Sequence, residues 1–201
     1  VVLISLDTTR FDHFGSNGKS DILTPHFDAL AQTGVRFEKA YAPIAVTGPS
    51  HYSLLSGQGP WSHGLLLNGR PLPDGAQMAA ERFSELGYRT GAFVSAPVLD
   101  GGLGFNRGFD VYDDHFDWIV GFSDTFWGRI WAGLQRRQDP HHVLERRAQR
   151  TMDKALDWLQ SARETQSPFF VWVHLFDPHG PYQPPPPWDT QYYDGGDPYD
   201  P

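Results

Sequence analysis

The chain contains no cysteine. This absence excludes disulfide scaffolds, zinc sites built on cysteine, iron–sulfur clusters and a cysteine nucleophile. No run of apolar residues approaches the roughly 18 that a membrane-spanning helix needs, and the opening VVLISL is too short for the core of a signal peptide. Basic residues are also few, because 16 Lys and Arg against 24 Asp and Glu give a net charge of −8. We therefore expect no nucleic-acid partner, since such proteins bind phosphates mainly through Lys and Arg.

A length of 201 residues is sufficient for one sizeable hydrophobic core and short for two full domains. The 21 glycines and 17 prolines predict a chain rich in loops. The opening VVLISL is typical of a buried strand cut at its N-terminal edge, and the last twenty residues have the composition of a loop. We therefore expect the chain to be one part of a longer protein.

Apolar runs alternate with segments of helical periodicity along the chain. The runs predict strands over Val1–Leu6, Val35–Tyr41, Gly91–Ser95 and Phe169–Phe176. Periodicity and capping residues predict helices over 24–32, 49–55, 76–86 and 139–164. This order predicts an α/β fold with a mainly parallel sheet flanked by helices.

Polar residues follow several of the predicted strands. Asp7 ends the first strand, Thr47 precedes a short helix, and Asp177 and His179 follow the last strand. Parallel sheets collect their ligands at the carboxyl ends of the strands, so these residues are candidates for a shared site. Taken alone, a carboxylate at a strand end such as Asp7 is more often a helix cap or a loop hydrogen-bond acceptor than a functional residue.

The segment AVTGPSHYSLLSG places a hydroxyl at the start of a helix. Gly48 allows the backbone to come close to a ligand, and Pro49 suits a first helical turn. The free N–H groups and the dipole of that helix would then face an anion beside Thr47. An ordinary helix cap by Thr47 or Ser50 explains the same pattern, and both interpretations remain open at this point.

Six segments occur in the order LISLDTTRFDHFG, TPHFDALAQTGVRFEKAYA, TGPSHYSLLSG, HGLLLNG, GFDVYDD and HLFDPHGPYQPP. In this order they resemble the N-terminal part of the sulfatase family, within the alkaline-phosphatase-like superfamily. The resemblance covers nearly the whole chain. It implies that residues 1–201 are the N-terminal part of a single catalytic domain whose C-terminal part, including further metal ligands, lies downstream.

The resemblance implies roles for the residues that match the family's motifs. Asp7 matches its first metal ligand, and Thr8 stands where a second aspartate is usual. Thr47 opens the run that matches the family's C/S-x-P-S-R motif and would be both nucleophile and metal ligand. His51 replaces the arginine of that motif and is expected at the substrate. Because its Cβ carries a methyl group, Thr47 cannot become the formylglycine of typical sulfatases, whereas phosphodiesterase-, phosphonate- and transferase-like branches of the superfamily use threonine.

Further roles follow from the same resemblance. Asn68, 21 residues after Thr47, matches an asparagine that holds a substrate oxygen, and His179 in DPHGPY matches a histidine that faces the substrate anion. Asp177 is expected as a metal ligand, with a loop anchor as the alternative. His63 is expected to fix the loop that carries Asn68. Because His174 lies within an apolar strand, the sequence favours a hydrogen-bonded core histidine there over a ligand.

These residues together predict a metal-dependent hydrolase of sulfate or phosphate/phosphonate esters that forms a covalent intermediate on Thr47. The expected cofactor is a divalent metal ion, Ca²⁺, Zn²⁺, Mn²⁺ or Mg²⁺, and the expected partner is a small anionic ester. A transferase of phospho groups on the same fold and a non-catalytic binding domain are the alternatives. The oligomeric state is left open.

Overall fold

The computed structural model describes residues 1–201 apart from 19–20, 117–145, 181, 183 and 193–201. Its strands are β1 (Val2–Leu6), β2 (Arg89–Val94), β3 (Val111–Asp113) and β4 (Phe169–Leu175). They form one sheet in the order β1-β4-β2-β3, and every pairing in it is parallel. The parallel sheet expected from the apolar runs is confirmed.

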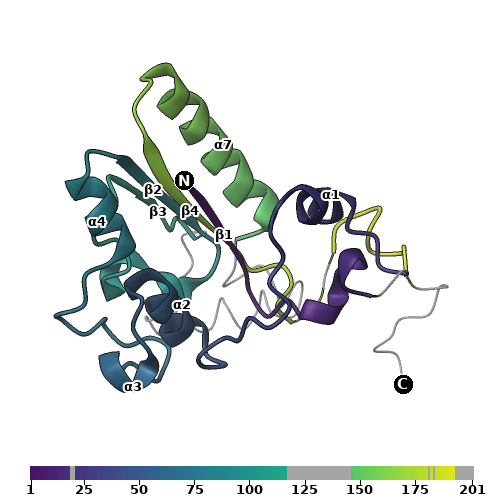
Figure 1. The fold of residues 1–201 in the computed structure, drawn as a ribbon, viewed down its shortest axis with the longest axis horizontal. Helices are drawn as coiled ribbons and strands as arrows, with labels where there is room; N and C mark the ends of the chain where they lie inside the picture. The colour runs from purple at the N-terminus through teal and green to yellow at the C-terminus, as the bar shows by residue number, and fades with distance from the viewer. Residues whose placement is uncertain (19–20, 117–145, 181, 183, 193–201) are drawn as a thin grey trace, which may run out of the picture.

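Helices cover both faces of this sheet (Figure 1). The helices of the described residues are α1 (Pro25–Thr33), α2 (Thr47–Ser56), α3 (Pro60–His63), α4 (Ala79–Glu85) and α7 (Ala148–Glu164). Short 3₁₀ turns lie at Phe11–His13, Gly15–Asn17, Pro97–Leu99 and Gly101–Leu103. α2 and α4 pack on one face of the sheet and α7 packs on the other, so the domain has three layers.

The central strand β4 joins the two halves of the core. Phe170 and Trp172 point into the cluster that contains α2 and α4, whereas Val171 and Val173 point into the cluster beneath α7. Successive side chains of a strand face opposite sides of the sheet, and β4 is covered on both. This explains why its sequence is a continuous apolar run rather than an alternating one.

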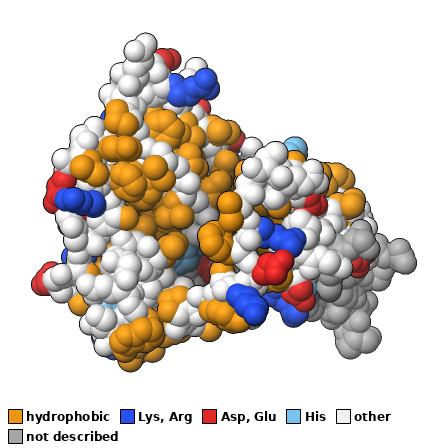
Figure 2. All heavy atoms as spheres, in the orientation of Figure 1, with side chains coloured by type: hydrophobic (Ala, Val, Ile, Leu, Met, Phe, Trp, Pro, Cys, Tyr) orange, Lys and Arg blue, Asp and Glu red, His pale blue; other side chains and the backbone are white. Residues whose placement is uncertain are grey.

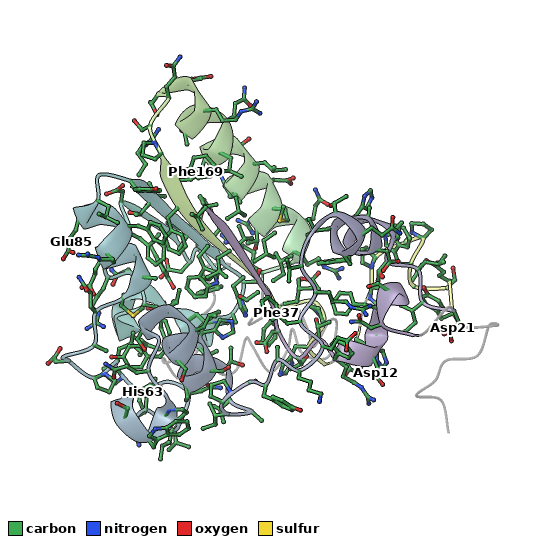
Figure 3. All side chains as sticks on the ribbon, in the orientation of Figure 1. Asp12, Asp21, Phe37, His63, Glu85 and Phe169 are labelled. Carbon is green, nitrogen blue, oxygen red and sulfur yellow. The ribbon has the colours of Figure 1, made fainter. Side chains whose placement is uncertain are left out.

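The predicted strand over Val35–Tyr41 is wrong. In the described part of the chain this segment pairs with no strand, and Val35 and Phe37 are 82% and 74% exposed. Figure 3 labels Phe37 on this segment. A strand needs a hydrogen-bonded neighbour, and the segment's alternating pattern cannot supply one.

The limits of the helices after α3 differ from the predictions. The helix predicted over 76–86 is confirmed in its centre as α4, which begins at Ala79. The helix predicted over 139–164 falls partly on 139–145, which lie outside the described residues. Arg147 has an extended backbone, and α7 begins after it at Ala148. Strand β3 and helix α3 were not predicted, because three or four residues carry too short a pattern.

A buried ion pair connects α7 to the strands. The side chain of Arg146 is 2% exposed and contacts the carboxylate of Asp113, at the end of β3. Its Nε also donates to Thr151 Oγ1 at 2.8 Å, and its backbone N–H donates to Ser95 O. The start of α7 is therefore fixed to the carboxyl ends of both β2 and β3.

The strand β1 lies at one edge of the described sheet, and Val2 and Ile4 on it are about half exposed. Figure 2 shows hydrophobic side chains gathered on the face where β1 and the N-terminus lie in Figure 1. None of the helices that the structure describes is both long and apolar enough to cross a membrane.

Candidate active site

Asp7 and Thr47 meet at the carboxyl end of β1. Asp7 follows the strand directly, its backbone N–H donates to Leu175 O, and its side chain is buried. Thr47 Oγ1 donates a hydrogen bond of 3.1 Å to Asp7 Oδ2, although the two residues are 40 positions apart. Two of the three residues predicted as metal ligands are thus in contact, and one of them, Thr47, is also the predicted nucleophile.

Helix α2 begins at Thr47, two residues earlier than the sequence predicts. Val46 occupies the cap position and Thr47 lies in the first turn, so its hydroxyl is free to bond Asp7 instead of capping the helix. The simple helix-cap interpretation of Thr47 is therefore wrong. An α-helix of this length carries a partial positive charge at its N-terminus, here beside the hydroxyl.

Asn68 is hydrogen-bonded to the first turn of α2. The N–H of Gly48 donates to Asn68 Oδ1 at 2.7 Å. A Cβ at position 48 would lie 3.0 Å from that oxygen, so glycine permits the close approach. Because Oδ1 is occupied, the Nδ2 donors of Asn68 are the atoms left to meet a substrate oxygen.

His63 holds the loop that carries Asn68, as the sequence predicts. Leu65 N–H donates to His63 Nδ1 at 3.1 Å, so the ring proton lies on Nε2. Nε2 bonds Ser53 Oγ at 2.8 Å, and Ser53 in turn donates to Pro49 O in α2. Figure 3 labels His63 on α3, far in the view from Asp12.

His51 is placed differently from the expectation. Its ring is buried, Nδ1 donates to Thr47 O at 2.8 Å, and Nε2 accepts from Ser5 Oγ at 3.1 Å. The carbonyl can only accept, which places the proton on Nδ1. Trp172 Nε1 donates to Ser5 Oγ, which completes the network. Both ring nitrogens are hydrogen-bonded within the protein, so the expected contact of His51 with the substrate is not favoured.

This network predicts sensitivity to acid. Burial, together with the nearby His174, lowers the pKa of His51 to about 4, against about 6.5 in an unfolded chain. Below about pH 6.5 the His51 ring therefore takes up a proton in the unfolded state, whereas in the folded state it does so only near pH 4. The contribution of His51 to the free energy of unfolding is fully present above about pH 6.5, and it falls by up to about 3 kcal/mol as the pH drops toward 4.

The test is to measure the free energy of unfolding of the full-length protein between pH 7.5 and 4. The His51→Gln variant should lose less stability over this interval than the wild type. His26→Gln, a substitution at an exposed histidine, should follow the wild type. An equal loss in wild type and His51→Gln would contradict the assignment of a neutral, buried ring.

The loop after β4 carries His179 and Asp177. His179 Nδ1 donates to Gly180 O at 2.6 Å and its ring stacks on Phe176, so Nε2 is the atom left for a ligand. Asp177 Oδ2 accepts from the N–H of Ala148 at 2.7 Å. This bond anchors the loop to the start of α7, which matches the alternative role foreseen for Asp177; its role as a metal ligand stays a prediction.

Thr8 ties Asp7 to this loop. Its φ is 51°, which is rare for a β-branched residue. Its hydroxyl donates to Pro178 O at 3.0 Å, one residue before His179. We interpret the unusual backbone as the consequence of turning the chain directly after Asp7 while this bond holds the two loops together.

The environment of Asp7 keeps it ionised. Burial acts to raise the pKa of its carboxyl, but His174 and the hydrogen bond from Thr47 outweigh burial, so the pKa lies below its ordinary value. His174 is fully buried as expected, with Nε2 3.5 Å from Asp7 Oδ2. Contrary to the expectation, neither of its ring nitrogens has a hydrogen-bond partner among the described residues.

The donors at Asp7 fit a divalent ion. A buried, ionised carboxylate and a hydroxyl in contact are oxygen ligands that hard cations accept. Among the residues that the structure describes, no group of three or more His, Cys, Asp or Glu side chains could hold a metal by itself. An ion bound at Asp7 and Thr47 would therefore need further ligands.

The structure thus joins Asp7 with Thr47 and Asn68 with the turn that follows Thr47. It also adds His174, which sequence reasoning assigned to the core. In the folded sheet His174 is paired with Ser5, two residues before Asp7, and this pairing brings it close to Asp7. The register of the strands is a property of the folded sheet.

Several known proteins are similar to this chain in sequence or in fold. An arylsulfatase of Clostridium perfringens is 27% identical over 92% of this chain and 44% of its own length. The phosphonate monoester hydrolase of Agrobacterium radiobacter has the same fold, with a TM-score of 0.70, 22% identity, and coverage of 94% of this chain and 43% of its own. A protein solved in complex with its substrate D-glucosamine-2-N,6-O-disulfate superposes with a TM-score of 0.69, at 22% identity over 92% of this chain and 35% of its own.

The chain spans less than half the length of each of these relatives. The fold is alkaline-phosphatase-like, as the resemblance implied. Residues 1–200, almost the entire chain, match the family described as Sulfatase. This chain therefore belongs to the sulfatase family.

Proposed function

We propose that the full-length protein is a metal-dependent hydrolase of sulfate or phosphate/phosphonate esters that works through a covalent intermediate on Thr47. The contact between Thr47 Oγ1 and Asp7 Oδ2 carries the proposal. It places a hydroxyl, a buried anion and a helix N-terminus at one point at the carboxyl end of a parallel sheet, where α/β enzymes act.

Thr47 supplies the nucleophilic oxygen. Its hydroxyl proton points at Asp7 Oδ2, so the lone pairs of Oγ1 face away from the carboxylate. Oγ1 gives up its proton to solvent and forms a bond to the sulfur or phosphorus of the ester while the bond to the leaving alcohol oxygen breaks. Water then attacks the same atom, a proton returns to Thr47 Oγ1, and the sulfate, phosphate monoester or phosphonate product is released.

The start of α2 and Asn68 hold the ester oxygens. The first turn of α2 presents its dipole to a negative charge beside Thr47. Asn68 Nδ2 adds donors, while its Oδ1 is held by the N–H of Gly48. Groups that are already oriented in this way stabilise the charge that develops in the transition state.

His179 protonates the leaving oxygen. Its Nδ1–H is fixed on Gly180 O, so a proton for the substrate can only be carried at Nε2. Stacking on Phe176, with ring centroids 4.3 Å apart, holds the plane of the ring. Such a fixed ring suits a general acid.

Asp7 and Thr47 would hold a divalent ion together with further ligands, of which Asp177 is the predicted one. Such an ion supplies positive charge that lowers the pKa of the Thr47 hydroxyl and neutralises the ester oxygens. Asp7 is ionised and buried, and therefore contributes a full negative charge to binding.

The identity of residue 47 sets the expected substrate class. Formylglycine is made from cysteine or serine, and Thr47 carries a methyl group on the carbon that would become the aldehyde. We therefore expect aryl phosphodiesters and phosphonates to be turned over faster than aryl sulfates. Paired aryl substrates that differ only in the ester group, with a sulfated glucosamine as a further member, measure this preference.

The same assay tests the proposed activity. Metal-free protein, prepared with a chelator, should turn over none of the esters, and activity should return with Mn²⁺, Zn²⁺, Mg²⁺ or Ca²⁺ added separately. Turnover that is unaffected by the chelator would contradict metal dependence. A clear preference for the sulfate would contradict the substrate class, and turnover of none of the esters with any ion would contradict the hydrolase itself.

A further inference from the structure

His174 lies in the middle of the sheet, near its catalytic end. It is paired with Ser5 of β1 on one side and with Val94 of β2 on the other. Its side chain is fully buried, and its ring meets that of His51 edge-on, with centroids 4.8 Å apart. A polar ring thus occupies a core position where an apolar side chain would pack without burying an unpaired polar group.

Both ring nitrogens of His174 are buried, and in the described part of the chain neither has a hydrogen-bond partner. The polar groups around the ring are already used, because Ser5 Oγ and both nitrogens of His51 bond each other and their neighbours. Asp7 Oδ2 is the polar atom that faces Nε2, at 3.5 Å. This separation exceeds the usual limit of about 3.2 Å for an N–H···O bond.

An unpaired buried N–H is unfavourable, and such groups in a folded protein call for an explanation. Here the orphan nitrogen and a buried carboxylate face each other across a small gap. The carboxylate can only accept, so the proton that suits this contact lies on Nε2 and leaves Nδ1 unprotonated. A slight movement of Asp7 toward His174 closes the bond.

The exposure of the neighbouring side chains distinguishes two possible roles for the His174 ring, a hydrogen bond to the metal ligand Asp7 and direct ligation of the metal. Asp7 is 7% exposed and Thr47 is half-buried, whereas His174 is completely buried. An ion that enters from solvent therefore meets Asp7 and Thr47, while His174 lies behind the carboxylate. This arrangement favours a hydrogen bond to the metal ligand over direct ligation of the metal.

We infer that His174 is a positioning residue that donates Nε2–H to Asp7 Oδ2 and holds the carboxylate in the orientation that binds a divalent ion. The inference rests on the proposed function, because it requires an ion at Asp7. Ligating carboxylates are commonly held by such hydrogen bonds, and their loss weakens metal affinity.

Calorimetric titration of the full-length protein with Mn²⁺, Ca²⁺ and Zn²⁺, each separately, tests the inference without any turnover. His174→Phe keeps a ring but removes the donor, and should weaken binding by about 10- to 100-fold. His174→Gln places an amide N–H at a similar reach and should retain most of the affinity. Phe170→Leu, on the same face of β4 and within the core, should leave the affinity unchanged.

Imidazole ¹⁵N spectra of the wild-type protein, labelled at histidine, show directly which ring nitrogen carries the proton. The signal that His174→Gln removes identifies the residue. It should show a proton on Nε2 and none on Nδ1, both before and after the ion is added. Loss of the Nε2 proton on adding the ion would show direct ligation and overturn the inference.

The two proposals fail in different ways. If the wild type binds an ion and His174→Phe binds it equally well, the positioning role is wrong and the proposed hydrolase is unaffected. If the wild type binds none of the three ions, the proposed function fails and the role of His174 fails with it.

Discussion

Replacing Thr47 by valine should lower turnover by at least about a thousandfold, equivalent to about 4 kcal/mol of transition-state stabilisation. Valine has nearly the shape of threonine and lacks Oγ1, the atom that contacts Asp7 Oδ2 at 3.1 Å. The loss of one hydrogen bond costs about 1 kcal/mol of stability, so the protein should remain folded. Steady-state kinetics on the best ester, together with thermal unfolding, measure both effects.

Two control variants separate the roles of the hydroxyls in this turn. Thr47→Ser retains an oxygen at the same place and should keep a substantial part of the turnover. Ser50→Ala removes the nearby hydroxyl that also suits a helix cap, and should leave turnover close to normal. Turnover by Thr47→Val near the wild-type rate, or a collapse in Ser50→Ala, would show that Thr47 is not the nucleophile.

Replacing Arg146 by methionine should lower the free energy of unfolding by about 3 kcal/mol. The Arg146 side chain is 2% exposed and its partner Asp113 is 16% exposed, so the substitution leaves a poorly solvated carboxylate without its cation. Burial acts to raise the pKa of Asp113, but Arg146 outweighs burial and holds it below the ordinary value. Thr151 also loses the hydrogen bond from Arg146 Nε.

The double variant that also carries Asp113→Asn should regain part of the lost stability, because it removes the unpaired charge. Arg82→Met breaks an exposed pair with Glu85 of ordinary length, 3.0 Å, and should have a much smaller effect. Denaturant unfolding of the full-length protein compares the three variants. Equal losses in Arg146→Met and Arg82→Met would contradict the importance of burial for this ion pair.

Several features of this protein could be predicted from local patterns alone. The apolar runs of β2 and β4 are long enough to be recognised, because strands covered on both faces need no polar alternation. The run of β1 is equally continuous, although Val2 and Ile4 are about half exposed. The resemblance to the sulfatase family also depends on short motifs in a fixed order, which require no knowledge of contacts. Polar residues directly after such strands are local features as well, and Asp7 was found in this way.

The partners of each side chain depended on the tertiary structure. The contact between Asp7 and Thr47 spans 40 positions, and no local pattern specifies which loop a hydroxyl will meet. His51 matches a substrate-binding position in the motif, yet the fold buries its ring between α2 and β1 and uses both nitrogens. The exposed segment Val35–Tyr41 failed as a strand for a related reason, because pairing requires a neighbour that the pattern does not reveal.

His174 shows the difference most clearly. Within its apolar run it was indistinguishable from a hydrogen-bonded core residue, since burial follows from the run itself. Only the parallel register of β1 and β4 places its Nε2 opposite Asp7 Oδ2, and among the residues that the structure describes neither ring nitrogen has a hydrogen-bond partner. Composition and periodicity determine which residues leave water, whereas hydrogen bonds and charges act over a few ångströms and are determined by strand order and register.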